Sequence, residues 1–114
     1  MCVGEFSPAS HSARPEGRME TRPVLTLDWL SSQIFRDRLD WVKIDVEGAE
    51  VAVIKGGLDT IARCKPKLLI ENHEGYRPGV RVEIDRLLLP LGYKETKNWQ
   101  GDGINDNWSL WSAK

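Results

Sequence analysis

The residues best suited to chemistry lie in the segment KIDVEGAE, residues 43–50. Two carboxylates, Asp45 and Glu47, end a run of β-branched and apolar residues and stand directly before Gly48. In open α/β sheets, ligands bind in the crevice beyond the carboxyl ends of the strands. A carboxylate there can orient or deprotonate a bound hydroxyl. The sequence therefore predicts that Asp45 faces a pocket.

A second apolar run ends in the same way, with Glu71 and His73 in the segment ENHEG. If the two strands are neighbours, these side chains converge with Asp45 and Glu47 on one crevice. Such a set could hold a divalent ion or act in general-base chemistry. The spacing is not one that a metal ion enforces, so no metal ligands are assigned. Capping of a helix start by carboxylates is the alternative explanation for Glu47 and for Glu50.

Five short segments are expected to be strands because apolar or β-branched residues dominate them: residues 24–27, 41–46, 67–71, 93–97 and 107–112. Their alternation with helices predicts an α/β fold, with a mostly parallel sheet and crossover helices. The last two segments can form an antiparallel pair. Residues 1–22 have no repeating apolar pattern, and we expect them to be disordered or the cut end of a longer chain.

Three helical patterns lie between these strands. Asp28 can cap a helix that carries Leu30 and Ile34. A second pattern is interrupted at Gly56-Gly57, where a kink or break is expected. The third follows Pro78 and ends at a capping Gly92. The apolar stripes of the second and third helices are Val51, Ile54, Leu58 and Ile61, and Val80, Ile84, Leu87, Leu88 and Leu91.

Composition disfavours several classes of partner. The net charge of −1 gives no attraction to a nucleic-acid backbone or to anionic lipid. No apolar run approaches the length of a membrane span, and the N-terminus lacks the pattern of a signal peptide. Cys2 and Cys64 are far apart, and we interpret them as unpaired thiols in the cytoplasm.

Three stretches within roughly residues 22–93, LTLDWL, WVKIDVEGAEVAVIKGG and KPKLLIENH, resemble the C-terminal part of the FkbM family of methyltransferases. The block KIDVEGAE carries most of this resemblance, since eight consecutive residues fit. The resemblance implies a Rossmann-like fold and methyl transfer from S-adenosylmethionine, usually to a hydroxyl oxygen, here of a small molecule or a sugar.

The resemblance also implies roles for individual residues. Asp45, Glu47 and Gly48 would end the fourth strand and face the donor's methyl group or the acceptor, and Glu71 and His73 would follow the fifth strand. We therefore assign Asp45, Glu47 and His73 as catalytic residues. Gly48 and Glu71 are assigned to cofactor binding.

In that family, the donor is held by a glycine-rich turn after the first strand and by contacts after the next two. The first 22 residues are too short to supply three strands and crossovers of about a dozen residues each. Residues 23–114 are thus expected to be the C-terminal half of a methyltransferase domain, inactive alone because the binding loop is absent.

Three functions stay open at this point: a methyltransferase fragment, a non-catalytic half-fold that binds a partner, and a small metal-dependent hydrolase, which ranks last. Without a first strand beside it, the strand at residues 41–46 would leave one edge unpaired. Unpaired apolar edges pair with other chains, so a homodimer through this edge is expected.

Overall fold

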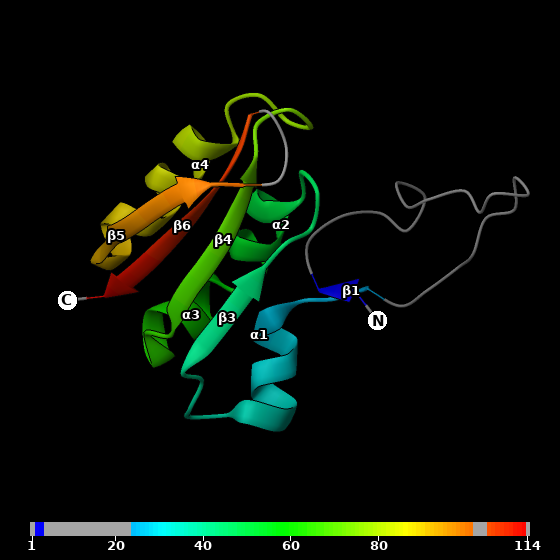
Figure 1. Cartoon of the computed structure of the whole chain (residues 1–114). Coiled ribbons are helices and arrows are strands. Elements are labelled where there is room, and N and C mark those ends of the chain that lie inside the picture. The colour runs from blue at the N-terminus through cyan, green and yellow to red at the C-terminus, as the bar shows by residue number, and fades with distance from the viewer. Residues whose placement is uncertain (1, 4–23, 102–104, 114) are drawn as a thin grey trace, which may run out of the picture.

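The computed structural model of the chain describes residues 2–3, 24–101 and 105–113. Its main sheet has four strands in the order β3-β4-β6-β5. Helices α2, α3 and α4 lie together against one face of this sheet (Figure 1). The bounds of these elements are Trp41–Ile44 (β3), Glu50–Lys55 (α2), Leu58–Cys64 (α3), Lys67–His73 (β4), Val80–Leu88 (α4), Tyr93–Gln100 (β5) and Asp106–Ala113 (β6).

The main sheet is mixed. Strands β3 and β4 are parallel, whereas β6 is antiparallel to both β4 and β5. The α/β class and the antiparallel final pair are confirmed, but the expectation of a mostly parallel sheet was wrong. The reason is that β6 inserts between β4 and β5 after a short connection from β5, and such connections join antiparallel strands.

A separate two-stranded parallel sheet is formed by β1, Cys2–Val3, and β2, Val24–Leu25. Apart from β1, the segment predicted to be a disordered leader lies outside the described residues. No helix in the described part of the chain is both long and apolar enough to cross a membrane.

The core lies between the sheet and the three helices that cover it. The helical stripe breaks at Gly56-Gly57 into α2 and α3, as predicted. A Cβ atom on Gly57 would lie 2.7 Å from Cδ2 of Leu27, so only glycine lets helix α1, Leu27–Leu30, pack this closely. The buried apolar residues of this cluster are Leu27, Ile44, Val51, Val53, Ile54, Ile61, Leu68, Ile70, Val80, Ile84, Leu88, Tyr93 and Trp111.

Helix capping near the start of the described chain differs from the prediction. The side chain of Thr26, not that of Asp28, caps α1 by accepting a hydrogen bond from the Trp29 N–H at 3.0 Å. Asp28 instead accepts hydrogen bonds from the N–H groups of Asp59 and Thr60, at 3.4 and 2.8 Å, and so caps α3. Sequence patterns show local caps, whereas this contact spans two helices.

Several element ends also differ. Helix α1 continues as a π-helical turn, Ser31–Phe35, which leaves Ile34 65% exposed rather than packed. At the other end of the sequence, α4 is followed by a 3-10 turn, Leu89–Leu91, and Gly92 ends it with φ of 86°, so that predicted cap is confirmed. Strand β3 stops before Asp45, whereas β4 continues as far as His73.

Candidate functional site

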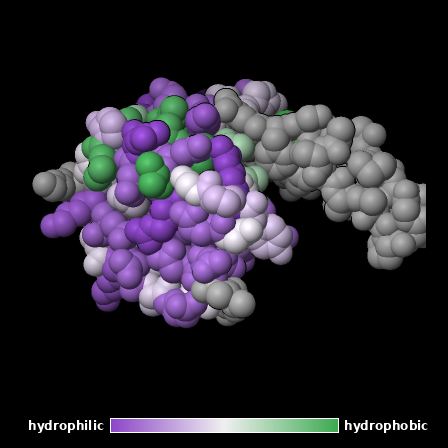
Figure 2. Space-filling view, turned by 90° about the horizontal axis from the view of Figure 1, so that it is seen from above, coloured by the Kyte–Doolittle hydropathy of each residue, from purple (hydrophilic) through white to green (hydrophobic). Residues whose placement is uncertain are grey.

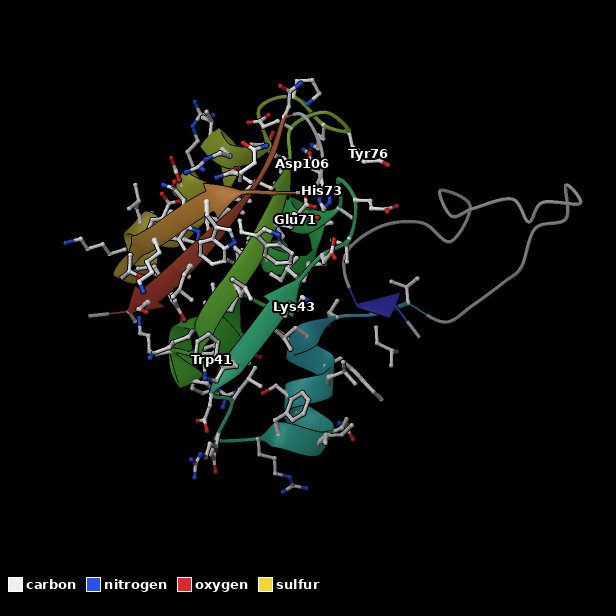
Figure 3. The ribbon with its side chains drawn as sticks, viewed as in Figure 1. Trp41, Lys43, Glu71, His73, Tyr76 and Asp106 are labelled. Carbon is white, nitrogen blue, oxygen red and sulfur yellow. The ribbon has the colours of Figure 1, made fainter. Side chains whose placement is uncertain are left out.

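The predicted chemical residues lie where the parallel strands β3 and β4 end. Asp45 is the first residue after β3, and the register pairs Ile44 with Ile70, so the two strand ends meet. Glu71 and His73 are two residues apart on β4 and therefore point to the same face. Figure 3 shows their side chains close together near the end of β4.

His73 is held by carboxylates on both ring nitrogens. Its Nε2 atom lies 2.8 Å from Oε1 of Glu71 and 3.5 Å from Oδ1 of Asp45. Its Nδ1 atom lies 2.5 Å from Oε1 of Glu50. The imidazole is almost fully buried, as are the carboxylates of Glu50 and Glu71. His73 is therefore fixed in orientation by three elements of the fold.

Glu50 is the site residue that the sequence did not reveal. It begins α2, as a capping carboxylate would, but its side chain is 0% exposed. Its Oε1 atom also accepts a hydrogen bond from the Gly48 N–H at 3.0 Å. The sequence carries no signal for this inward orientation, because exposed and buried carboxylates are equally suited to a first helical turn.

The turn that precedes α2 contains Glu47 and Gly48. Both have positive φ, 49° and 104°. A Cβ atom on Gly48 would lie 3.1 Å from Cβ of Tyr76, so the turn requires glycine. Glu47 is exposed and makes no hydrogen bond or ion pair with the described residues. The structure thus brings together three of the four expected residues, Asp45, Glu71 and His73, without Glu47.

Burial and the neighbouring charges shift the pKa values of Glu71 and His73. Burial raises the pKa of Glu71, and the negative charge of Asp45 adds to this effect. Burial alone would lower the pKa of His73, but its hydrogen bond with Glu50 and the surrounding carboxylates outweigh burial and raise that pKa. One of these carboxylates is Asp106, which lies opposite His73 on β6. Negative charge is therefore concentrated around one imidazole.

Asp45 is the member of the cluster that a substrate could reach. Its side chain is 45% exposed, against 4% for His73 and 7% for Glu71. Seen from above the strand ends, the surface is largely hydrophilic, as suits a polar ligand (Figure 2). A separate hollow of about 270 Å³ contains none of these residues. It is lined by Val51, Lys55, Arg77, Glu83, Arg86 and Leu87.

In the main sheet, strand-to-helix turns lie at residues 45–49, between β3 and α2, and at residues 74–79, between β4 and α4. Gly48 lies in one of them, but Tyr76 packs against the place where its side chain would be. The assignments of Gly48 and Glu71 to cofactor binding, and of Glu47 to catalysis, stay predictions.

Comparison with known proteins gives one match. A family model described as the methyltransferase FkbM domain matches residues 4–95. This match covers the chemical residues and begins well before the first motif at residue 22. No curated protein and no solved structure matches the chain.

Proposed function

This chain belongs to the FkbM methyltransferase family, and we propose that it contributes the acceptor side of an S-adenosylmethionine-dependent O-methyltransferase. The acceptor would be a hydroxyl group of a small molecule or a saccharide. The observation that carries this proposal is the half-exposed carboxylate of Asp45, which stands at the end of β3 beside the buried His73. It is the accessible base among groups that are otherwise enclosed.

On this proposal, Asp45 accepts the hydrogen bond of the acceptor hydroxyl and takes its proton as the oxygen becomes a nucleophile. His73 does not meet the acceptor. Its Nε2 atom, 3.5 Å from Oδ1 of Asp45, holds that carboxylate in place, and Glu50 holds His73 in turn. The bound donor would supply a methyl group on a sulfonium centre and leave as a neutral thioether.

We infer that residues 23–114 are the C-terminal half of a Rossmann-like domain and that its donor-binding turn lies outside this half. Two features support this. Strand β3 is an edge of the sheet within the described residues, although the family match covers its segment and the residues before it. In addition, no described turn from a strand to a helix has a Gly-x-Gly pattern.

Two measurements test these statements. Calorimetry with S-adenosylmethionine should give weak or no binding to the 114-residue chain, and a micromolar Kd would contradict the half-site. The chain should then be fused behind the N-terminal half of an FkbM domain and assayed with a labelled donor and a saccharide panel. We expect a stable ether product.

The role of Asp45 is tested in the same fusion. Asp45→Asn should lower turnover by about tenfold or more, the usual worth of an acid–base group. The matched control is Asp37→Asn, because Asp37 is a fully exposed carboxylate that pairs with Arg63 rather than with His73. Equal turnover of the two variants would remove Asp45 from the mechanism.

A second candidate function is favoured by the free edge of β3. A non-catalytic half-fold that binds a partner through this edge, with a second copy of the chain as the partner, would explain an exposed Trp41 there. We also propose a cytoplasmic location, since Cys64 is free, as thiols are in a reducing compartment.

A further inference from the structure

We propose that Asp45, Glu71 and His73 bind a divalent transition-metal ion. Ligand atoms of these three side chains lie within 4.8 Å of one another. They are two carboxylate oxygens and one imidazole nitrogen, from the ends of two adjacent strands. The sequence assigned no metal here because its spacing does not enforce one. The fold brings the three side chains together, although their spacing in the sequence does not enforce a metal site.

The separations suit one shared ion. Metal–ligand bonds of about 2.1 Å place adjacent ligand atoms roughly 3 to 3.4 Å apart. Nε2 of His73 lies 2.8 Å from a Glu71 oxygen and 3.5 Å from an Asp45 oxygen. Asp45 is the half-exposed member of the set, so its side chain is the one that would rotate to bring its oxygen to the ion.

Glu50 gives His73 the orientation that a metal ligand needs. Metal-binding histidines usually donate their other ring N–H to a carboxylate, which fixes the tautomer. Here Nδ1 is 2.5 Å from Oε1 of Glu50, so Nε2 is the ring nitrogen that faces the carboxylates of the ligand set. The Gly48 N–H, 3.0 Å from the same oxygen, holds Glu50 in turn. This chain of contacts joins the turn after β3 to the ligand set.

A second, independent feature points to a cation. Oε2 of Glu71 is buried and has no hydrogen-bond partner among the described residues. Such an orphaned buried oxygen is costly. Within the described ranges, the carboxylates of Asp45, Glu50 and Glu71 form ion pairs with His73 alone, never with a lysine or arginine. Three carboxylates therefore surround a single imidazole, and a divalent ion would balance them.

The mixed oxygen and nitrogen ligands favour Zn²⁺ or Mn²⁺ over Mg²⁺, which prefers oxygen alone. Binding of such an ion does not depend on methyl transfer, so the two proposals can fail separately. If both hold, the ion lies at the strand end where the acceptor hydroxyl would meet Asp45.

The experiment adds Mn²⁺ to the full chain, freed of metal with a chelator, and follows the electron paramagnetic resonance signal of free Mn²⁺. We expect one bound ion per chain, displaced by Zn²⁺, which forms stronger complexes with such ligands. Asp45→Asn should weaken binding by at least about tenfold, and Glu50→Gln by about 10–100-fold, as for other partners of metal-bound histidines.

The matched control is Asp37→Asn, which removes a fully exposed carboxylate that pairs with Arg63 at 4.0 Å and should leave the Kd unchanged. Asp45→Asn decides the matter because a half-exposed side chain can be replaced without unfolding, which circular dichroism verifies. The competing explanation is that a protonated His73 is itself the buried cation. In that case, the free Mn²⁺ signal would not fall, or would fall equally with Asp45→Asn, and either result overturns the proposal.

Discussion

Nδ1 of His73 lies 2.5 Å from Oε1 of Glu50, and both side chains are buried. This contact joins the last residue of β4 to the first residue of α2. Because a buried carboxylate is costly without a partner, Glu50 and His73 each make the other's position favourable. The contact therefore ties the geometry of the site to the stability of the fold.

Replacing this carboxylate should destabilise the protein. Glu50→Gln keeps the shape of the side chain but removes its charge, and we expect a loss of about 1–3 kcal/mol, typical of a buried group left poorly paired. Urea unfolding measures it. The control is Glu83→Gln, which breaks a 2.8 Å pair with Arg77 that is about 40% exposed. Such pairs contribute about 0–1 kcal/mol, so equal losses would contradict a special role for Glu50.

Alanine substitutions at three glycines distinguish the cost of backbone strain from the cost of steric crowding. Gly48→Ala meets both, since φ is 104° and the new Cβ lies 3.1 Å from Tyr76. Gly79→Ala meets strain alone, with φ of 87° and no atom within 4 Å, and Gly75→Ala meets neither. We expect losses of about 1–3 kcal/mol for Gly79, a larger loss for Gly48 and almost none for Gly75.

Thermal or urea unfolding of the three alanine variants gives the order directly. A Gly48 variant no less stable than the Gly79 variant would show that Tyr76 moves aside at no cost. The metal-binding test can then be repeated on the Gly48→Ala variant. The Gly48 N–H donates a hydrogen bond to Glu50 and so positions that side chain.

Tyr93 provides a test at high pH. Burial raises the pKa of its phenol from 10.0 to about 12, with a smaller contribution from Cys64, and the hydroxyl donates to the Pro66 carbonyl at 2.5 Å. A raised folded-state pKa means that the neutral phenol stabilises the fold below pH 10. This stabilisation is lost as the pH rises towards 12.

The measurement is an ultraviolet titration of Tyr76→Phe, which leaves Tyr93 as the single tyrosine of the chain. Tyrosinate should appear near pH 12 in the folded protein and near pH 10 after unfolding in urea. The same midpoint in both states would show that Tyr93 is not buried as described.

The fold was predictable where local patterns decide it. Gly56-Gly57 divided the helical stripe into two helices, and Gly92 ended the last helix, because glycine acts on its own backbone. The insertion of β6 beside β4 was not predictable, since strand order depends on contacts far apart in sequence. The capping of α3 by Asp28 was not predictable for the same reason, because this contact joins residues 32 positions apart.

The candidate site was predictable in part. Carboxylates at two strand ends indicated Asp45, Glu71 and His73, because parallel neighbours bring their ends together. Periodicity also placed Glu47 with Asp45, but β3 ends at Ile44 and the positive φ of Glu47 interrupts the alternation. Glu50 was missed because helical sequence alone does not show which face of a first turn is buried.

Within the part of the chain that the structure describes, β3 and β5 are the two edge strands of the main sheet. Strand β5 carries the charges of Lys94, Glu95 and Lys97, which discourage pairing with another chain, whereas β3 has only Lys43. Residues 24–25 pair with β1 rather than with β3. We therefore expect the chain to dimerise through β3 at micromolar concentrations or above.

Sedimentation should show this dimer, and Trp41→Lys should abolish it by placing a second positive charge on the edge. The control is Trp99→Lys on β5, where an equally accessible tryptophan, 45% exposed against 55% for Trp41, is replaced on the edge that is already charged. It should leave the dimer intact. A wild-type chain that sediments as a monomer and unfolds in one cooperative transition would contradict the prediction and show that the free edge of β3 is tolerated. Loss of the dimer in the Trp99 variant alone would move the interface to β5.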